Sequence, residues 1–217
     1  RLLNHRHSSL FLHDASSHTV DYESFHGNVL IFVQTKLSFL LRIFKLEDFF
    51  NFTYDESIPA FVSRNLILWH HIPLIGGVTP FGFHLGPYFY WFSALLLFIG
   101  GLNPLIWGYA AAVISASTTI LMFLVCRQLF DRKTGFLAAT FWTFSYLANI
   151  YDRHFWALYW GPLVSLVTLY SLNKIINGKY KYVYLLSMTF ALAIHADLSN
   201  LLFVALSAIA WFLYKIP

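Results

Sequence analysis

Charged residues are scarce in this chain. Lysine, arginine, aspartate and glutamate make up 11% of its 217 residues, whereas soluble domains carry about one quarter. The net charge of +4 comes from few groups, and the sequence holds no basic patch of the kind that binds nucleic acid. The single cysteine, Cys126, excludes a disulfide within the chain. These shortages point away from soluble domains, disulfide scaffolds and nucleic-acid-binding proteins.

Long uncharged stretches are present instead. Hydrophobic residues make up 58% of the sequence, and residues 104–126, 135–151 and 155–172 contain no charge. Each stretch is about as long as a helix that crosses a hydrocarbon core of roughly 30 Å. The sequence therefore predicts an all-α, polytopic integral membrane protein.

The first 27 residues differ because they are polar and rich in histidine. Five of the ten histidines lie here: His5, His7, His13, His18 and His26. Their spacing matches no metal-ligand motif and no cysteine accompanies them, so we predict no metal site. Residues 1–27 are predicted to form a disordered tail, and residues 28–217 the membrane module.

Two basic clusters predict how the chain crosses the membrane. They comprise Arg127, Arg132 and Lys133, and then Lys174, Lys179 and Lys181. Because lysine and arginine concentrate in cytoplasmic loops, both clusters are predicted on that side. Segments 58–69 and 88–100 are then predicted to be helices at the outer interface. The predicted spans are about 28–50, 104–126, 135–151, 155–172, 182–195 and 198–214.

The first predicted span carries two cations, Lys36 and Arg42. A lysine near the middle of a membrane costs about 2.5 to 3.5 kcal/mol on insertion scales. We therefore expect Lys36 to face the interior of the bundle and Arg42 to extend toward the interface.

Three polar groups are predicted on the outer face. They are Asp55 with Glu56, then Asp152 with Arg153 and His154, and finally His195 with Asp197. Ionisable groups at membrane depth are costly and tend to mark functional sites. Their convergence predicts a cleft at the outer interface whose ligand is partly lipid.

Each group also has a structural interpretation. Thr53 and Glu56 match a capping box, although Ser57 is an alternative N-cap. Asp152 and Arg153 could form an ion pair in an ordinary turn, and His195 and Asp197 could cap the following helix. Asn51 begins a weak N-glycosylation sequon.

Five features follow one another along the chain: LLRIFKLEDFF, TYDE, GPYFYW, CRQLFDRKTGFLAA and the outer turn at Asp152. Their order resembles the GT-C superfamily of glycosyltransferases that use polyprenyl-phosphate sugars. Within that superfamily, the chain resembles the bacterial branch related to aminoarabinose transferases and protein O-mannosyltransferases. The resemblance covers about residues 37–217.

The resemblance implies an inverting sugar transfer to a lipid, glycan or protein acceptor on the outer face of a prokaryotic inner membrane. It assigns Asp55, with Glu56 beside it, to the acidic position of the first outer loop and Asp152 to the second. Asp55 would act as general base on the acceptor hydroxyl. No cofactor is expected; some GT-C enzymes use a divalent metal held by carboxylates, and that alternative stays open although the sequence shows no convincing ligand set.

Contacts to the donor phosphate require cations or hydrogen-bond donors. Arg64, Arg153 and His154 are candidates. Members of the aminoarabinose branch carry lysines where this chain has His84 with Leu85, and His195. Both histidines are therefore further candidates for substrate binding.

Two other functions are compatible with the sequence. A transporter or flippase would use its Asp, Arg and His groups as a substrate path, although such proteins usually contain internal repeats. A noncatalytic, lipid-binding membrane subunit is the second. The chain begins at Arg1 and ends soon after an apolar run, so we also expect it to be the N-terminal part of a longer protein.

Overall fold

The computed structural model describes residues 29–50, 52–79 and 81–215. All secondary-structure elements named in these residues are helices. The prediction of an all-α chain is confirmed for these residues. The predicted tail at 1–27 and sequon residue Asn51 lie outside them. After a helical segment at 29–43, the helices are α2 (Leu46–Phe49), α3 (Tyr54–Trp69), α4 (Tyr88–Ile99), α5 (Leu105–Leu129), α6 (Arg132–Phe144), α7 (Tyr146–Tyr151), the 3-10 helix η1 (Ala157–Trp160), α8 (Gly161–Ile176), α9 (Tyr182–Ala196) and α10 (Ser199–Lys215).

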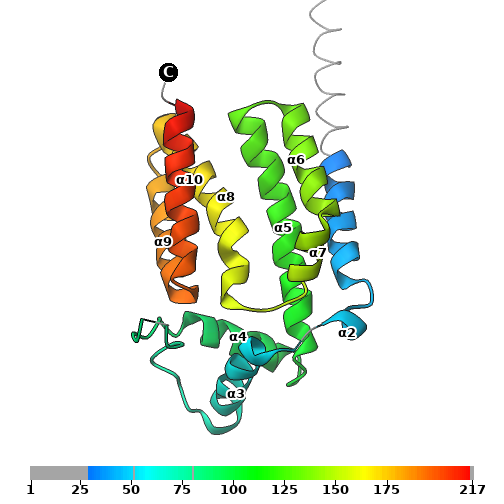
Figure 1. Ribbon diagram of the computed structural model, residues 1–217, viewed down its shortest axis with the longest axis vertical. Coiled ribbons are helices and arrows are strands. Elements are labelled where there is room, and N and C mark those ends of the chain that lie inside the picture. The colour runs from blue at the N-terminus through cyan, green and yellow to red at the C-terminus, as the bar shows by residue number, and fades with distance from the viewer. Residues whose placement is uncertain (1–28, 51, 80, 216–217) are drawn as a thin grey trace, which may run out of the picture.

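The longer helices run side by side along one axis, and α3 and α4 lie across one end of the bundle (Figure 1). Helix α5 packs against α6 and α8, and α8 in turn packs against α9 and α10. Gly135 allows α5 and α6 to approach closely, because a Cβ atom there would lie 2.7 Å from the Phe123 carbonyl oxygen. Helices α3 and α4 pack mainly against each other.

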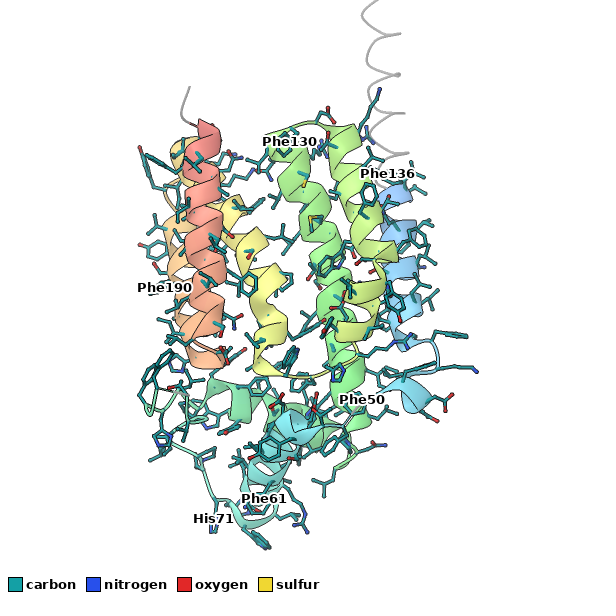
Figure 2. All side chains as sticks on the ribbon, in the orientation of Figure 1. Phe50, Phe61, His71, Phe130, Phe136 and Phe190 are labelled. Carbon is teal, nitrogen blue, oxygen red and sulfur yellow. The ribbon has the colours of Figure 1, made fainter. Side chains whose placement is uncertain are left out.

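The two ends of the bundle contain different groups. The turns that join α5 to α6 and α8 to α9 lie at the upper end of Figure 1, and both are rich in lysine and arginine. The α7–η1 and α9–α10 turns lie at the lower end, next to α3 and α4. In Figure 2, Phe130 lies at the upper end, whereas Phe61 and His71 lie at the lower. The predicted outer groups therefore share one end.

Among the described helices, α5 alone is both long and apolar enough to cross a membrane. Helices α4 and α9 and residues 199–213 are apolar but shorter. Their outward surfaces carry large apolar side chains, as Phe190 on α9 illustrates in Figure 2.

Several expected segments have different boundaries in the structure. The helix expected at 58–69 begins at Tyr54, and the span expected at 155–172 is divided into η1 (Ala157–Trp160) and α8 (Gly161–Ile176). The expected span at 135–151 is divided into α6 and α7 at Ser145, whose backbone is extended and whose hydroxyl accepts the Ala148 N–H at 3.3 Å. The first span is interrupted at Lys45, which has a left-handed φ of 50°. The helical hydrogen-bond pattern stops at both points.

An aromatic core joins the lower end to the bundle. Phe155 is 1% exposed, and its ring stacks on Trp107 of α5 and on Phe89 of α4 at centroid distances of 5.3 and 5.4 Å. The Trp107 indole donates to the Ser93 carbonyl oxygen at 3.0 Å. These contacts fix the turn after α7 against α4 and α5.

Candidate functional site

Helix α3 begins at Tyr54 with Thr53 as its N-cap. The Thr53 backbone N–H donates to Glu56 Oε2 at 2.9 Å, and the Thr53 hydroxyl donates to the same oxygen. The capping box is confirmed, and the alternative N-cap at Ser57 is wrong because the backbone is already helical there. This early start places Asp55 and Glu56 in the first helical turn, where the helix dipole favours carboxylates.

A pocket of about 240 Å³ opens where α3, α4, the loop between them, the 156–158 segment and the end of α9 meet. It is lined by Asp55, Ile58, Pro59, Gly76, Gly77, Val78, Leu85, Gly86, Phe89, Tyr90, Trp156, Ala157, Leu158, His195, Ala196 and Asp197. The structure thus brings together two of the three predicted polar groups, although they are about 140 residues apart in sequence.

Asp55 is the exposed carboxylate of this pocket. Its side chain makes no hydrogen bond within the described part of the chain. A carboxylate in this condition can accept a proton or a hydrogen bond from a molecule that enters the pocket.

His195 and Asp197 line the pocket from the end of α9. The imidazole lies directly against Gly86, since a Cβ atom there would be 1.9 Å from His195 Nδ1. The Asp197 Oδ1 atom accepts the backbone N–H of Ser199, the first residue of α10, at 2.7 Å. Asp197 thus orders the start of α10, as the structural interpretation expected, while also lining the pocket.

A second polar group lies inside the bundle. Arg42 is 0% exposed, and its Nε donates to Asp152 Oδ2 at 2.7 Å. The same carboxylate oxygen accepts the Ser115 hydroxyl, and Arg42 Nη1 donates to the Ser38 hydroxyl at 2.8 Å. Burial raises the pKa of the Asp152 carboxyl, an effect that Arg42 and Ser115 oppose. We name Arg42, Asp152, Ser115 and Ser38 the buried polar cluster.

This cluster corrects two expectations about charge. Asp152 pairs with Arg42 rather than with its neighbour Arg153. Arg42 is buried, and Lys36, which was expected to face the interior, is exposed with its ammonium 4.4 Å from the Phe32 ring centroid. Gln34, Ser38 and Arg42 recur every fourth residue and all are buried, so the polar face of segment 29–43 packs inward.

The turn after Asp152 connects this cluster to α3. His154 Nδ1 lies 3.3 Å from Glu56 Oε1, and Glu56 is 1% exposed. The Arg153 guanidinium donates to the Leu41 carbonyl oxygen at 3.0 Å and lies 4.9 Å from the Phe49 ring centroid. Glu56, Arg153 and His154 are therefore engaged in internal contacts, and none of them lines the pocket.

Two other predicted residues also lie outside the pocket lining. Arg64 is exposed on α3 with its guanidinium 5.8 Å from the Trp69 ring centroid. His84 is exposed, and its Nδ1 lies 3.2 Å from the Gly76 carbonyl oxygen. Of the eight predicted site residues, Asp55 and His195 line the pocket.

Several pocket residues were missed from the sequence. Trp156 and Tyr90 contribute aromatic walls, and Gly76 and Gly86 allow the backbone to approach closely. The run LIGGVTPFGFHLGP signals a loop by its glycines, but it does not indicate that α9 packs against that loop. The burial of Arg42 could have been predicted, because Gln34, Ser38 and Arg42 are four residues apart and therefore lie on one face of a helix.

A metal site was not expected. Among the described residues, no group of three or more His, Cys, Asp and Glu side chains is arranged to hold a metal ion. The expectation that no cofactor is needed stays a prediction.

No protein-family model, curated protein or solved structure matches this chain. The resemblance to GT-C glycosyltransferases is therefore a prediction from motif order. Any functional conclusion rests on the chemistry of the pocket and on the apolar character of the helices.

Proposed function

We propose that this chain carries the reaction site of a membrane glycosyltransferase that moves a sugar from a polyprenyl-phosphate donor to an acceptor hydroxyl. The observation that carries the proposal is the exposed Asp55 carboxylate in a pocket it shares with His195 and Trp156. The motif order that resembles GT-C enzymes, which includes Asp55 itself, also supports the proposal.

Asp55 is assigned the role of general base. As the acceptor oxygen attacks the anomeric carbon, its proton passes to the carboxylate. The new carbon–oxygen bond forms while the bond to the phosphate oxygen breaks, and the electron pair leaves with the phosphate. Attack from the face opposite the leaving group inverts the anomeric configuration.

His195 is assigned to the phosphate. No lysine or arginine occurs among the described residues that line the pocket, and His195 is its one basic side chain. An imidazole N–H can donate a hydrogen bond to a departing phosphate oxygen. Trp156 and Tyr90 offer aromatic surface against which the apolar face of a sugar ring can pack.

Glu56 and Asp152 take supporting roles in this proposal. Glu56 closes the capping box and contacts His154, which sets the direction of the first turn of α3 and therefore of Asp55. Asp152 holds the turn that contains His154 and leads to Trp156. Neither carboxylate lines the pocket.

The membrane placement is part of the same proposal. Helix α5 crosses the bilayer, and the neighbouring apolar helices accompany it, with the basic turns toward the cytoplasm. The pocket end then faces the outer side of a prokaryotic inner membrane. A donor held in the bilayer by its polyprenyl chain would present its sugar phosphate at this interface.

The proposal is tested by replacing Asp55 with asparagine. Membranes that contain the variant are supplied with radiolabelled mannose on polyprenyl phosphate, and label transferred to the membrane acceptors is measured. We expect transfer to fall by roughly 100-fold or more, because a positioned base typically contributes about 10²- to 10⁴-fold.

Asp48→Asn is the matched control, since Asp48 is an exposed acid on α2 outside the pocket lining. Its transfer rate should equal that of the unchanged chain. Undiminished transfer by Asp55→Asn would remove the base assignment. Equal loss in both variants would show that the effect does not come from the pocket.

A further inference from the structure

The loop between α3 and α4 exposes an unusual amount of apolar surface. No Asp, Glu, Lys or Arg occurs between Arg64 and Arg127. Residues 74–79 and 81–85, which we name the apolar hairpin, carry five exposed large apolar side chains: Leu74, Ile75, Val78, Phe81 and Phe83. Contiguous exposed apolar surface of this kind marks contact with a membrane or a partner.

The apolar hairpin is held in shape by its own backbone. Gly76 N–H donates to the Leu85 carbonyl at 2.8 Å, Leu85 N–H to the Gly77 carbonyl at 2.9 Å and Thr79 N–H to the Phe83 carbonyl at 2.8 Å. The rings of Phe81 and Phe83 stack at a centroid distance of 6.4 Å. Phe81, which is 80% exposed, is thus presented to the surroundings by a loop whose two sides are hydrogen-bonded to each other.

The base of the hairpin is fixed against the helices. Trp91 Nε1 of α4 donates to the Pro73 carbonyl at 2.9 Å. A Cβ atom on Gly76 would lie 2.3 Å from the Gly86 carbonyl oxygen, and Gly86 in turn touches His195 at the end of α9. These contacts fix where the exposed side chains lie relative to the bundle.

The apolar hairpin lies close to α9 at the lower end of the bundle (Figure 1). In Figure 1 it lies below the lower end of α9 and extends sideways beyond that helix. Helix α9 exposes Phe190, which Figure 2 labels on that side of the bundle. A bilayer that surrounds α9 would therefore have its lower surface, in the view of Figure 1, at the level of the hairpin.

We propose that the apolar hairpin inserts Phe81 and Phe83 into the interfacial region of the bilayer beside α9. Gly76, Gly77 and Val78 also line the pocket, so the pocket would open beside the lipid rather than into bulk water. A lipid-borne substrate could then reach Asp55 without leaving the membrane. This inference rests on the membrane placement in the proposed function.

The occupant to which we commit is bilayer lipid. An uncharged aliphatic and aromatic surface at the rim of a membrane bundle suits the headgroup and upper acyl region. A protein partner or a second copy would instead shield these side chains from both lipid and water.

The test is a depth measurement with a nitroxide spin label. Cys126 is replaced by serine, Phe81 is replaced by cysteine and labelled, and the full chain is reconstituted in phosphatidylcholine vesicles. Collision rates with oxygen, which concentrates in lipid, and with a water-soluble nickel chelate are compared. We expect the oxygen-to-nickel ratio at position 81 to be at least 5-fold higher than at a water reference.

Two reference sites make the result interpretable. Lys179 is exposed in the α8–α9 turn, so Lys179→Cys is the water reference. Val113→Cys lies exposed on α5 and is the lipid reference. Val78→Cys is a second hairpin position in case the Phe81 variant does not fold.

Each other outcome overturns the inference. A ratio at position 81 equal to that at 179, with 113 in lipid, removes hairpin insertion and leaves the proposed function untouched. Low collision rates with both reagents at 81 indicate a protein contact instead. A water-like ratio at 113 removes the membrane placement and the hairpin inference together.

Discussion

The pocket and the buried polar cluster contain the same kinds of side chain in opposite surroundings. Asp55 is exposed and makes no hydrogen bond among the described residues, whereas Asp152 is 5% exposed and is bonded to Arg42 and Ser115. A carboxylate of the first kind is available to a ligand. One of the second kind already accepts two hydrogen bonds from within the chain and stabilises the connection between segments.

The difference matters because burial changes what a lost partner costs. An exposed carboxylate stays hydrated when a neighbour is removed. A buried carboxylate that loses its cation is left without either water or a counter-charge, and the resulting penalty is several kcal/mol. The largest stability effects should therefore come from the cluster and the smallest from the pocket.

Arg42→Met should have the largest effect. It leaves the Asp152 carboxylate buried beside Ser115 without its cation, and removing one partner of a buried pair costs about 3–5 kcal/mol. The free energy of unfolding, measured with denaturant in detergent micelles, should fall by that amount.

Lys36→Met is the matched control on the same helical segment. Lys36 is exposed, so its loss in micelles should change the free energy of unfolding by less than about 0.5 kcal/mol. Equal losses in the two variants would contradict the assignment of Arg42 to the interior.

Gly86→Ala should have an intermediate effect and should act on the pocket wall. The added Cβ would lie 1.9 Å from His195 Nδ1, so the imidazole or the loop must move. Because His195 is exposed and its ring can rotate away, the cost should fall toward the lower end of the roughly 1–3 kcal/mol of overpacking, measurable as a lower midpoint of thermal unfolding.

Gly77→Ala tests whether that effect is steric. A Cβ atom at Gly77 would lie 3.5 Å from the Tyr90 hydroxyl, which is ordinary contact distance. The unfolding midpoint of this variant should stay near that of the unchanged chain, and a drop as large as that of Gly86→Ala would count against the close contact with His195.

Glu56→Ala should be milder than Arg42→Met. It removes the Glu56 member of the capping box, and with it the acceptor of the Thr53 N–H and the contact to His154. The loss of a capping interaction costs about 1 kcal/mol, with a range of roughly 0.5–2. Loss of helical signal on titration with denaturant measures this change.

Asp55→Ala is its adjacent control and should have the smallest effect. An exposed side chain without a partner contributes little, so the free energy of unfolding should change by less than about 0.5 kcal/mol. If Asp55→Ala destabilised the chain as much as Glu56→Ala, the two neighbours would not have the separate roles that the structure gives them.

Much of the local structure follows from short-range features of the sequence. The expected segments at 88–100 and 182–195 correspond to α4 (Tyr88–Ile99) and α9 (Tyr182–Ala196), because apolar runs and polar breaks act on nearby residues. The capping box at Thr53 and Glu56 was also readable, since its two members are three residues apart. The break at Ser145 was not, because serine is tolerated inside many helices.

The candidate site was only partly predictable for a related reason. Asp55 and His195 stood out as ionisable groups in an apolar chain, and both line the pocket. Trp156 and Tyr90 resembled many other aromatic residues in the sequence, so nothing local distinguished them as pocket walls.

The sequence by itself determined the apolar composition and the helical class, because each depends on residues close together in the chain. It left the start of α3 open between Thr53 and Ser57. Tertiary structure alone decided which charges are buried. Arg42 and Asp152 lie 110 positions apart, and their pairing depends on how segment 29–43, α5 and the turn after α7 pack together. The same packing turns the face of segment 29–43 that carries Gln34, Ser38 and Arg42 inward and leaves Lys36, on another face, exposed. It also leaves Asp55 exposed in the pocket.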